Sequence, residues 1–142
     1  MNVLQAHTRA VLALLDADNA SPPLVVCNGQ VLADVVPPYV LVYFALRTPT
    51  GLEVPEMVSL EQTSDVIVTT AYCHSVGYDT PDAALGVAGR VRSQLRGVIP
   101  VISGRTCFPI VHSAGPPTSR DEKSQRPVFD QIDTYEFTSL PG

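Results

Sequence analysis

Two stretches of the chain repeat apolar residues at the spacing of an amphipathic helix. Over Met1–Leu15, apolar residues recur at intervals of three and four, and polar residues face the other way. Over Pro81–Arg96, the same spacing joins a second apolar set: Ala84, Leu85, Val87, Ala88, Val91 and Leu95. Thr80 and Pro81 suit the start of a helix, and Gly97 suits its end. The pattern therefore predicts one helix over Met1–Leu15 and another over Pro81–Arg96.

Two further stretches are dense in β-branched and aromatic residues, which favours strands. Val66–Val76 reads VIVTTAYCHSV, contains no Pro or Gly, and is predicted as the longest strand. Tyr39–Phe44 reads YVLVYF, is apolar on both faces, and predicts a strand that is covered on both sides. A short turn separates Val66–Val76 from the second helix, so we expect this strand and helix to pack as one unit.

A hairpin and a final strand complete the regular elements. Leu24–Cys27 is followed by Asn28-Gly29, a dipeptide that favours a two-residue hairpin turn, so Gln30–Asp34 is the expected return strand. Val128–Ser139 mixes apolar and acidic residues, and its second half is predicted as a strand. The order helix, strands, helix, strands predicts a single α+β domain over residues 1–142. Its two helices pack on one face of a mostly antiparallel sheet with long loops.

Proline and polar residues mark the irregular segments. Val98–Ile102 and Thr106–His112 each contain one proline and are expected at a sheet edge or as extended connections. Arg47–Glu61 is interrupted by Pro and Gly and is expected as an excursion outside the core. Ser113–Pro127 is the least hydrophobic segment, with three prolines and clustered charges of both signs. Such a composition predicts a mobile loop.

Composition describes a globular chain without a surface for nucleic acid. At 142 residues, with 45% hydrophobic and 16% charged residues, the chain can form its own core and carries fewer charges than the roughly 25% usual in soluble domains. A formal net charge of −5 argues against sequence-specific nucleic-acid binding and against anionic membranes, which require clustered Lys and Arg. No apolar stretch reaches the roughly 20 residues of a membrane crossing, so we expect a soluble protein made in the cytoplasm.

The sequence offers few groups for catalysis or metal binding. Cys27, Cys73 and Cys107 are odd in number and far apart, which disfavours disulfides and structural zinc. The nucleophile and base candidates are Cys73 with His74 and Cys107 with His112, but residues at odd separations in a strand point to opposite faces. The members of each pair can therefore meet only across strands, and the four residues match no metal-ligand spacing. We predict no catalytic, cofactor-binding or metal-binding residues and no enzymatic activity.

Several stretches together resemble one family of proteins. They are the amphipathic first helix, PPYVLVYF at Pro37–Phe44, HSVGYDTPDAALGVAGRVRSQLRG at His74–Gly97, GRTCFPIVH at Gly104–His112, and the closing FDQIDTYEFTSLPG. The order of these elements resembles the tail terminator proteins, also called tail-completion or minor tail proteins, of long-tailed bacteriophages, especially those of actinobacterial hosts. The resemblance covers nearly the whole chain and rests on element order and loose patterns.

The resemblance implies a structural, non-enzymatic virion protein. Members of the family form a hexameric ring on the last ring of the tail tube, stop tube growth, and present the surface to which the filled head attaches. The implied partners are further copies of the chain, the tail tube protein and head-tail connector proteins, and DNA passes through the ring. The implied location is the head-proximal end of the virion tail. A head-tail connector or neck protein and a small cytosolic enzyme with an unrecognised site remain as alternatives.

The residues expected at interfaces come from the charge pattern, because the family has no active-site residues to transfer. The polar side of the second helix, the excursion Arg47–Glu61 and the loop Ser113–Pro127 are the expected contact regions. Opposite charges on such surfaces set register and orientation between partners. The charged candidates are Arg90, Arg92, Arg96, Arg120, Asp121, Glu122, Lys123 and Arg126.

Overall fold

The last strand, β7 (Val128–Pro141), lies in the interior of a mixed sheet in our computed structural model, which describes residues 2–49, 66–122 and 125–142. On one side β7 pairs in antiparallel register with β3 (Ile67–Tyr78) along the whole of β3. On the other side three short strands pair with successive parts of β7: β4 (Arg105–Cys107), β5 (Val111–Ala114) and β6 (Ser119–Arg120). β7 spans 14 residues and β3 spans 12, so the prediction that Val66–Val76 is the longest strand is wrong.

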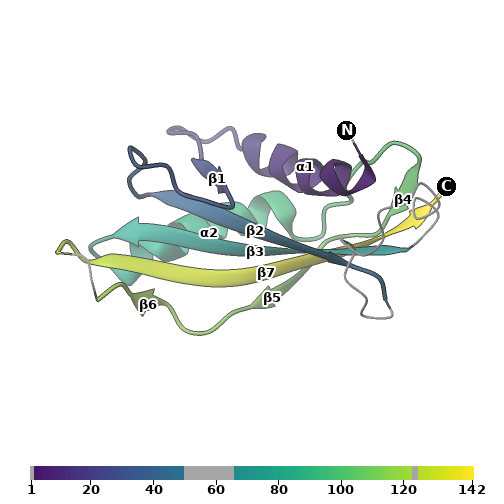
Figure 1. The fold of residues 1–142 in the computed structure, drawn as a ribbon. Coiled ribbons are helices and arrows are strands. Elements are labelled where there is room, and N and C mark those ends of the chain that lie inside the picture. The colour runs from purple at the N-terminus through teal and green to yellow at the C-terminus, as the bar shows by residue number, and fades with distance from the viewer. Residues whose placement is uncertain (1, 50–65, 123–124) are drawn as a thin grey trace.

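The sheet continues from β3 to β2 (Tyr39–Arg47) and ends at β1 (Val26–Asn28). β2 pairs with β3 in antiparallel register, whereas β1 pairs with β2 in parallel. Two helices, α1 (Val3–Asp16) and α2 (Pro81–Leu95), pack on one face (Figure 1). The structure thus confirms the predicted α+β class and the mostly antiparallel sheet.

The helix ends agree only in part with the predicted capping residues, since the cap of α1 was not predicted and the predicted cap at Thr80 does not form. Asn2 and Gln5 form a reciprocal capping box at the start of α1. Pro81 occupies the first turn of α2, preceded by Thr80 in an extended conformation, although the Thr80 side chain caps no backbone N–H. After α2, Gly97 has φ of +75°, a left-handed conformation that ends the helix at low cost for glycine.

The core lies between the helices and one face of the sheet. Side chains from α1, α2 and the inward positions of β2, β3 and β7 bury one another, among them Val11, Leu15, Val42, Val87, Leu95, Tyr135 and Phe137. β3 and α2 approach closely at Gly77: a Cβ atom there would lie 2.5 Å from the backbone C of Ala83. This strand and helix therefore pack as one unit, as the sequence predicts.

The predicted hairpin at Asn28-Gly29 is wrong. Gly29 does adopt a positive φ of +77°, but the chain after it forms no return strand beside β1. β2 takes that place, with Val26 opposite Val40 and the Gly29 N–H donating to the carbonyl of Val42. The dipeptide supports a local turn, but the position of β1 is decided by the longer apolar strand that it can join.

Two burial predictions are also wrong, and both for a geometric reason. β2 is covered on one face only, because both helices lie on the same side of the sheet, and Tyr43 on the other face is 44% exposed. On α2 the side chain of Leu85 is 47% exposed, because its position falls beside the buried stripe of Ala84, Val87, Ala88, Val91 and Leu95.

The predictions for the irregular segments are confirmed for some segments and stay untested for others. Val98–Ile102 is an extended connection, as expected, and Thr106–His112 is split into β4 and β5 around Pro109. Most of Arg47–Glu61 lies outside the described residues. Within Ser113–Pro127 the structure places β6, which the sequence does not predict, and mobility of this loop stays a prediction. Neither helix in the described part of the chain has the length and apolarity needed to cross a membrane.

Candidate functional site

A polar contact joins the first helix to the last strand. His7 on α1 is fully buried and stacks on Phe137 at a ring-centroid distance of 6.0 Å. Its Nδ1 lies 2.6 Å from the carbonyl of Val3, which can only accept, so Nδ1 carries a proton. Its Nε2 lies 2.6 Å from the Ser139 hydroxyl oxygen. The same oxygen accepts a hydrogen bond from Arg105 Nε at 2.9 Å. In the neutral ring, the Ser139 hydroxyl therefore donates to Nε2.

This serine–histidine pair is a structural contact. Both residues are 0% exposed, so no substrate reaches the hydroxyl. Burial lowers the pKa of His7 below 6.5, and the nearby charge of Arg105 lowers it further against the raising effect of the Val3 carbonyl. The result is a neutral imidazole that connects α1, β4 and β7.

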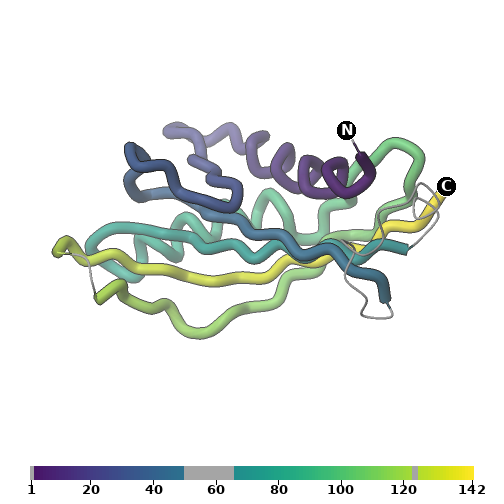
Figure 2. The backbone as a smooth tube through the Cα atoms, in the orientation of Figure 1, coloured from purple at the N-terminus to yellow at the C-terminus, as the bar shows by residue number. Residues whose placement is uncertain are grey.

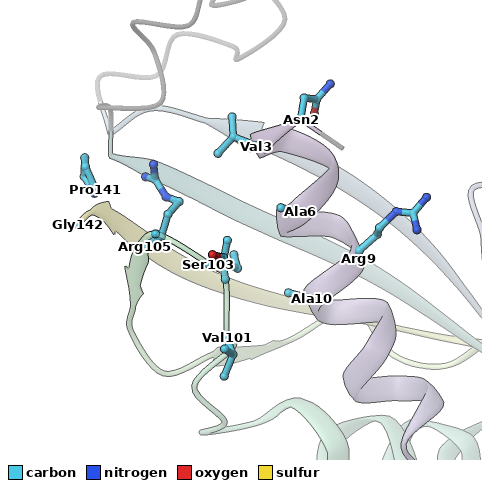
Figure 3. Close-up of a pocket in the computed structure, with 12 residues that line it drawn as sticks. Asn2, Val3, Ala6, Arg9, Ala10, Val101, Ser103, Arg105, Pro141 and Gly142 are labelled. Carbon is cyan, nitrogen blue, oxygen red and sulfur yellow. The ribbon is translucent and has the colours of Figure 1, made fainter.

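Above this contact lies an open groove of about 800 Å³, which we call the α1 groove (Figure 3). α1 forms one wall and the connection before β4 forms the other. The walls are largely apolar, and none of the described residues that line them is acidic. The residues used below are Val3, Ala6, Arg9, Ala10, Val101 and Arg105. Arg9 extends outward from α1 (Figure 3). Arg105 donates two hydrogen bonds to Ser139.

A second buried polar cluster lies under α2. Nε2 of His112 on β5 lies 3.0 Å from Oδ1 of Asp133 on β7, which is 2% exposed. The His112 ring packs on Tyr135 with centroids 4.9 Å apart. Cys73 lies opposite Asp133 in the β3–β7 register, and burial together with this carboxylate raises the pKa of the thiol to about 12. A thiol with such a pKa is protonated at neutral pH and is a poor nucleophile.

The two candidate nucleophile and base pairs, which the sequence pattern disfavours, do not form among the described residues. Cys73 faces the core, whereas the adjacent His74 points to the outer face and lies 3.0 Å from Oδ2 of Asp130. Cys107 and His112 occupy different strands, opposite Ser139 and Tyr135 respectively. Within residues 2–49, 66–122 and 125–142, no group of three or more His, Cys, Asp or Glu side chains could hold a metal ion.

The outer face of the sheet carries small polar pairs and exposed aromatic rings. Arg47 on β2 forms an ion pair with Glu136 on β7 at 3.1 Å, and Thr70 on β3 donates to the same carboxylate. Tyr43 and Tyr72 lie opposite each other in the β2–β3 register and are 44% and 41% exposed. On the face without helices, the Arg47–Glu136 pair thus reaches from β2 across β3 to β7.

The predicted interface residues on α2 do not behave alike. Arg90 is tied inward: its Nε donates to Asp18 at 2.8 Å and its Nη2 to the carbonyl of Pro22 at 2.9 Å. These bonds fix the chain that follows α1 against α2. Arg92 and Arg96 are exposed.

The predicted residues of the Ser113–Pro127 loop also fall into two groups. Arg126 donates two hydrogen bonds to Asp79, at 2.9 and 2.8 Å, and its guanidinium lies 3.8 Å from the ring centroid of Tyr78. These hydrogen bonds lower the pKa of the Asp79 carboxyl and raise that of Arg126. Arg120, Asp121 and Glu122 are exposed, and Lys123 lies outside the described residues.

Sequence reasoning missed two exposed apolar features. One is the α1 groove, which joins residues from three distant segments. The other is the turn between β1 and β2, where the Val35 N–H donates to the Leu32 carbonyl at 3.0 Å, and Leu32 and Val36 are 60% and 61% exposed. The signal for this turn was present in the apolar run Val31–Val36 with its one acidic residue, Asp34, but the hairpin prediction assigned Gln30–Asp34 to a strand.

No protein-family model matches the sequence, and a search of curated proteins finds no match. Among solved structures, the fold is similar to that of a chain in the "Virion of native gene transfer agent (GTA) particle", with a TM-score of 0.67. The similarity covers 96% of this chain and 97% of the other, at 17% sequence identity. The two chains therefore share a fold along nearly their whole length.

Proposed function

We propose that this protein is a structural subunit of a virion tail, the terminator subunit that forms a hexameric ring on the tail tube. The observation that carries the proposal is the likeness of nearly the entire fold to a chain from a virion particle. The sequence pattern independently resembles tail terminators of long-tailed bacteriophages. In this role the ring ends tube polymerisation at the head-proximal end of the tail, and its partners are the tube protein and the head-tail connector proteins.

The distribution of polar groups supports a role in assembly. Of the two clusters with the ingredients of catalysis, His7 with Ser139 is fully buried, and the side chains of His112 and Asp133 are 11% and 3% exposed. The exposed features are instead apolar side chains and charged side chains. We assign the exposed charged residues to contacts with the tube or the connector: Arg92, Arg96, Arg120, Asp121 and Glu122.

Tube polymerisation tests this proposal directly. The cognate tube protein is polymerised with and without the purified chain, and tube lengths are measured by negative-stain electron microscopy. The chain should arrest growth at substoichiometric amounts, whereas the same chain unfolded by heat should not. Tubes of unchanged length in both samples would contradict a terminator role.

Particles that lack the protein distinguish a terminator from a connector. Loss of a terminator gives tails of uncontrolled length, whereas loss of a connector gives tails of normal length beside separate filled heads. Mass measurement of the purified chain, alone and in the presence of tube ends, tests the ring. Six copies have a mass of about 91 kDa, six times the 15.2 kDa of one chain.

A further inference from the structure

Two exposed surfaces lie at opposite ends of the subunit. The apolar turn, which we define as Leu32, Ala33, Asp34 and Val36, belongs to the dark blue connection between β1 and β2 (Figure 1). The α1 groove lies at the other end, beside the N-terminus and β4. The trace in Figure 2 shows the same separation, with the C-terminal part of α1 between the two surfaces.

The apolar turn is closed by a hydrogen bond and exposes apolar side chains, as a segment that docks into a neighbouring groove would. The hydrogen bond from the Val35 N–H to the Leu32 carbonyl closes it, so its tip is held in one conformation. Leu32 and Val36 flank the tip and leave about three fifths of their surface in water, at 60% and 61% exposure. Between them lies the exposed Asp34, which is the only charged residue from Gln30 to Leu46.

The α1 groove offers the complementary chemistry. Its walls include Ala6, Ala10 and Val101, and the Val101 side chain is 90% exposed in the single subunit. A valine so exposed at the mouth of a hollow is little covered by the described residues of its own chain. The two charged residues of the lining, Arg9 and Arg105, are both cationic. The groove therefore suits an apolar segment that carries a carboxylate.

We infer that the apolar turn of one copy seats in the α1 groove of the next copy, with Leu32 and Val36 against its apolar walls and Asp34 beside Arg9. The inference rests on the proposed ring and names the surfaces that build it. Because the turn and the groove lie at opposite ends, each copy inserts one turn and receives another. Such a head-to-tail contact repeats until the ring closes. The exposed valine and leucine are then covered in the assembly and not in the isolated subunit.

Two single substitutions test the contact. Leu32→Asp blocks the turn, and Val101→Asp blocks the groove; both sites are exposed, so the thermal transition of the fold should stay at the wild-type temperature. Val111→Asp is the matched control, because Val111 is 64% exposed but belongs to β5, outside both surfaces. By sedimentation velocity, wild type and Val111→Asp should form rings, and the two blocked variants should stay monomeric.

An equimolar mixture of the two blocked variants gives the sharper result. The turn of the Val101→Asp chain fits the intact groove of the Leu32→Asp chain, but every other contact is blocked, so the mixture should form a dimer and nothing larger. Rings formed by either blocked variant alone would overturn the contact and leave the proposed ring standing. A wild type that is monomeric both alone and in assembled particles would overturn the proposed function and the contact together.

Charge reversal tests the pairing at the tip. Asp34→Arg should weaken ring formation by about tenfold, because it places a cation beside Arg9. Adding Arg9→Asp to the same chain restores opposite charges at every contact and should recover most of that loss. A double variant no better than Asp34→Arg alone would contradict the pairing of Asp34 with Arg9.

Discussion

The Ser139 hydroxyl lies 2.6 Å from Nε2 of His7, a hydrogen bond between residues 132 positions apart in the chain. This buried hydrogen bond holds α1 against β7. Because Nδ1 donates to the Val3 carbonyl and Arg105 donates to the same hydroxyl, only the neutral imidazole satisfies all of these groups.

This arrangement makes stability depend on pH in a definite direction. The pKa of His7 in the folded protein is lowered from 6.5, so the unfolded chain takes up the proton first as the pH falls. The contribution of His7 is complete above pH 6.5 and is lost below it, down to the folded pKa. Urea denaturation at pH 7.5 and 5.5 should show a larger loss of unfolding free energy for wild type than for His7→Gln. Equal losses would contradict a neutral buried His7.

Gly77 is expected to tolerate no side chain. An alanine Cβ there would lie 2.5 Å from the Ala83 backbone C and 2.6 Å from the Ala84 N, and the backbone of α2 cannot move away without losing its packing on β3. Gly77→Ala should lower the unfolding free energy by about 1–3 kcal/mol or more. Gly86→Ala is the control: it lies in α2 with no atom within 4 Å of the added Cβ, and it should stabilise by up to about 1 kcal/mol.

Leu95 anchors the end of α2 in the core. Its side chain is 0% exposed, so Leu95→Ala leaves a cavity and should cost about 2–5 kcal/mol in chemical denaturation. Leu85→Ala on the same helix, at 47% exposure, should change stability by less than about 0.5 kcal/mol. Similar losses of unfolding free energy for the two variants would contradict the assignment of Leu95 to the buried face of α2 and Leu85 to its exposed face.

The three thiols should react in a fixed order. Cys107 is half-buried on an edge strand, and it should be alkylated first in the native protein at pH 8. Cys73 has no exposed surface and a pKa raised to about 12, so it should react only when the protein unfolds. Mass spectrometry of the labelled peptides measures this order. Labelling of Cys73 at the rate of Cys107 would show that β3 opens without global unfolding.

Metal removal should leave the protein unchanged. The three cysteines have no ligand spacing, so neither a chelator nor their joint replacement by Ser or Ala should abolish assembly, although the replacement weakens packing. Thermal unfolding with and without chelator measures the first effect, and ring mass measures the second. A chelator that unfolds the protein would reveal a metal site.

Sequence reasoning succeeded where the signal is local. The helices α1 and α2 start or end within two residues of their predicted bounds, because apolar spacing and capping residues act over one or two turns. β3 was likewise evident from its β-branched residues. Each of these elements can be identified without knowing what it packs against.

Elements that depend on distant partners were missed. Asp133 interrupts the apolar pattern of β7, yet it is buried because His112 on β5 supplies a hydrogen bond from 21 residues away. β6 has two residues and exists through its pairing with β7, and β1 follows its parallel partner β2 instead of its own turn signal. The α1 groove was hidden for the same reason, since Ala6, Val101 and Pro141 meet only in the folded chain.

The interior position of β7 has a consequence for synthesis on the ribosome. β7 is translated after the six other described strands, and until it emerges β3 keeps an unpaired edge while β4, β5 and β6 have no strand to join. Pairing Ile67 with Ser139 closes 72 residues of chain in one step, a nonlocal contact of the kind that slows folding. The nascent chain therefore waits with open strand edges that can pair with another polypeptide.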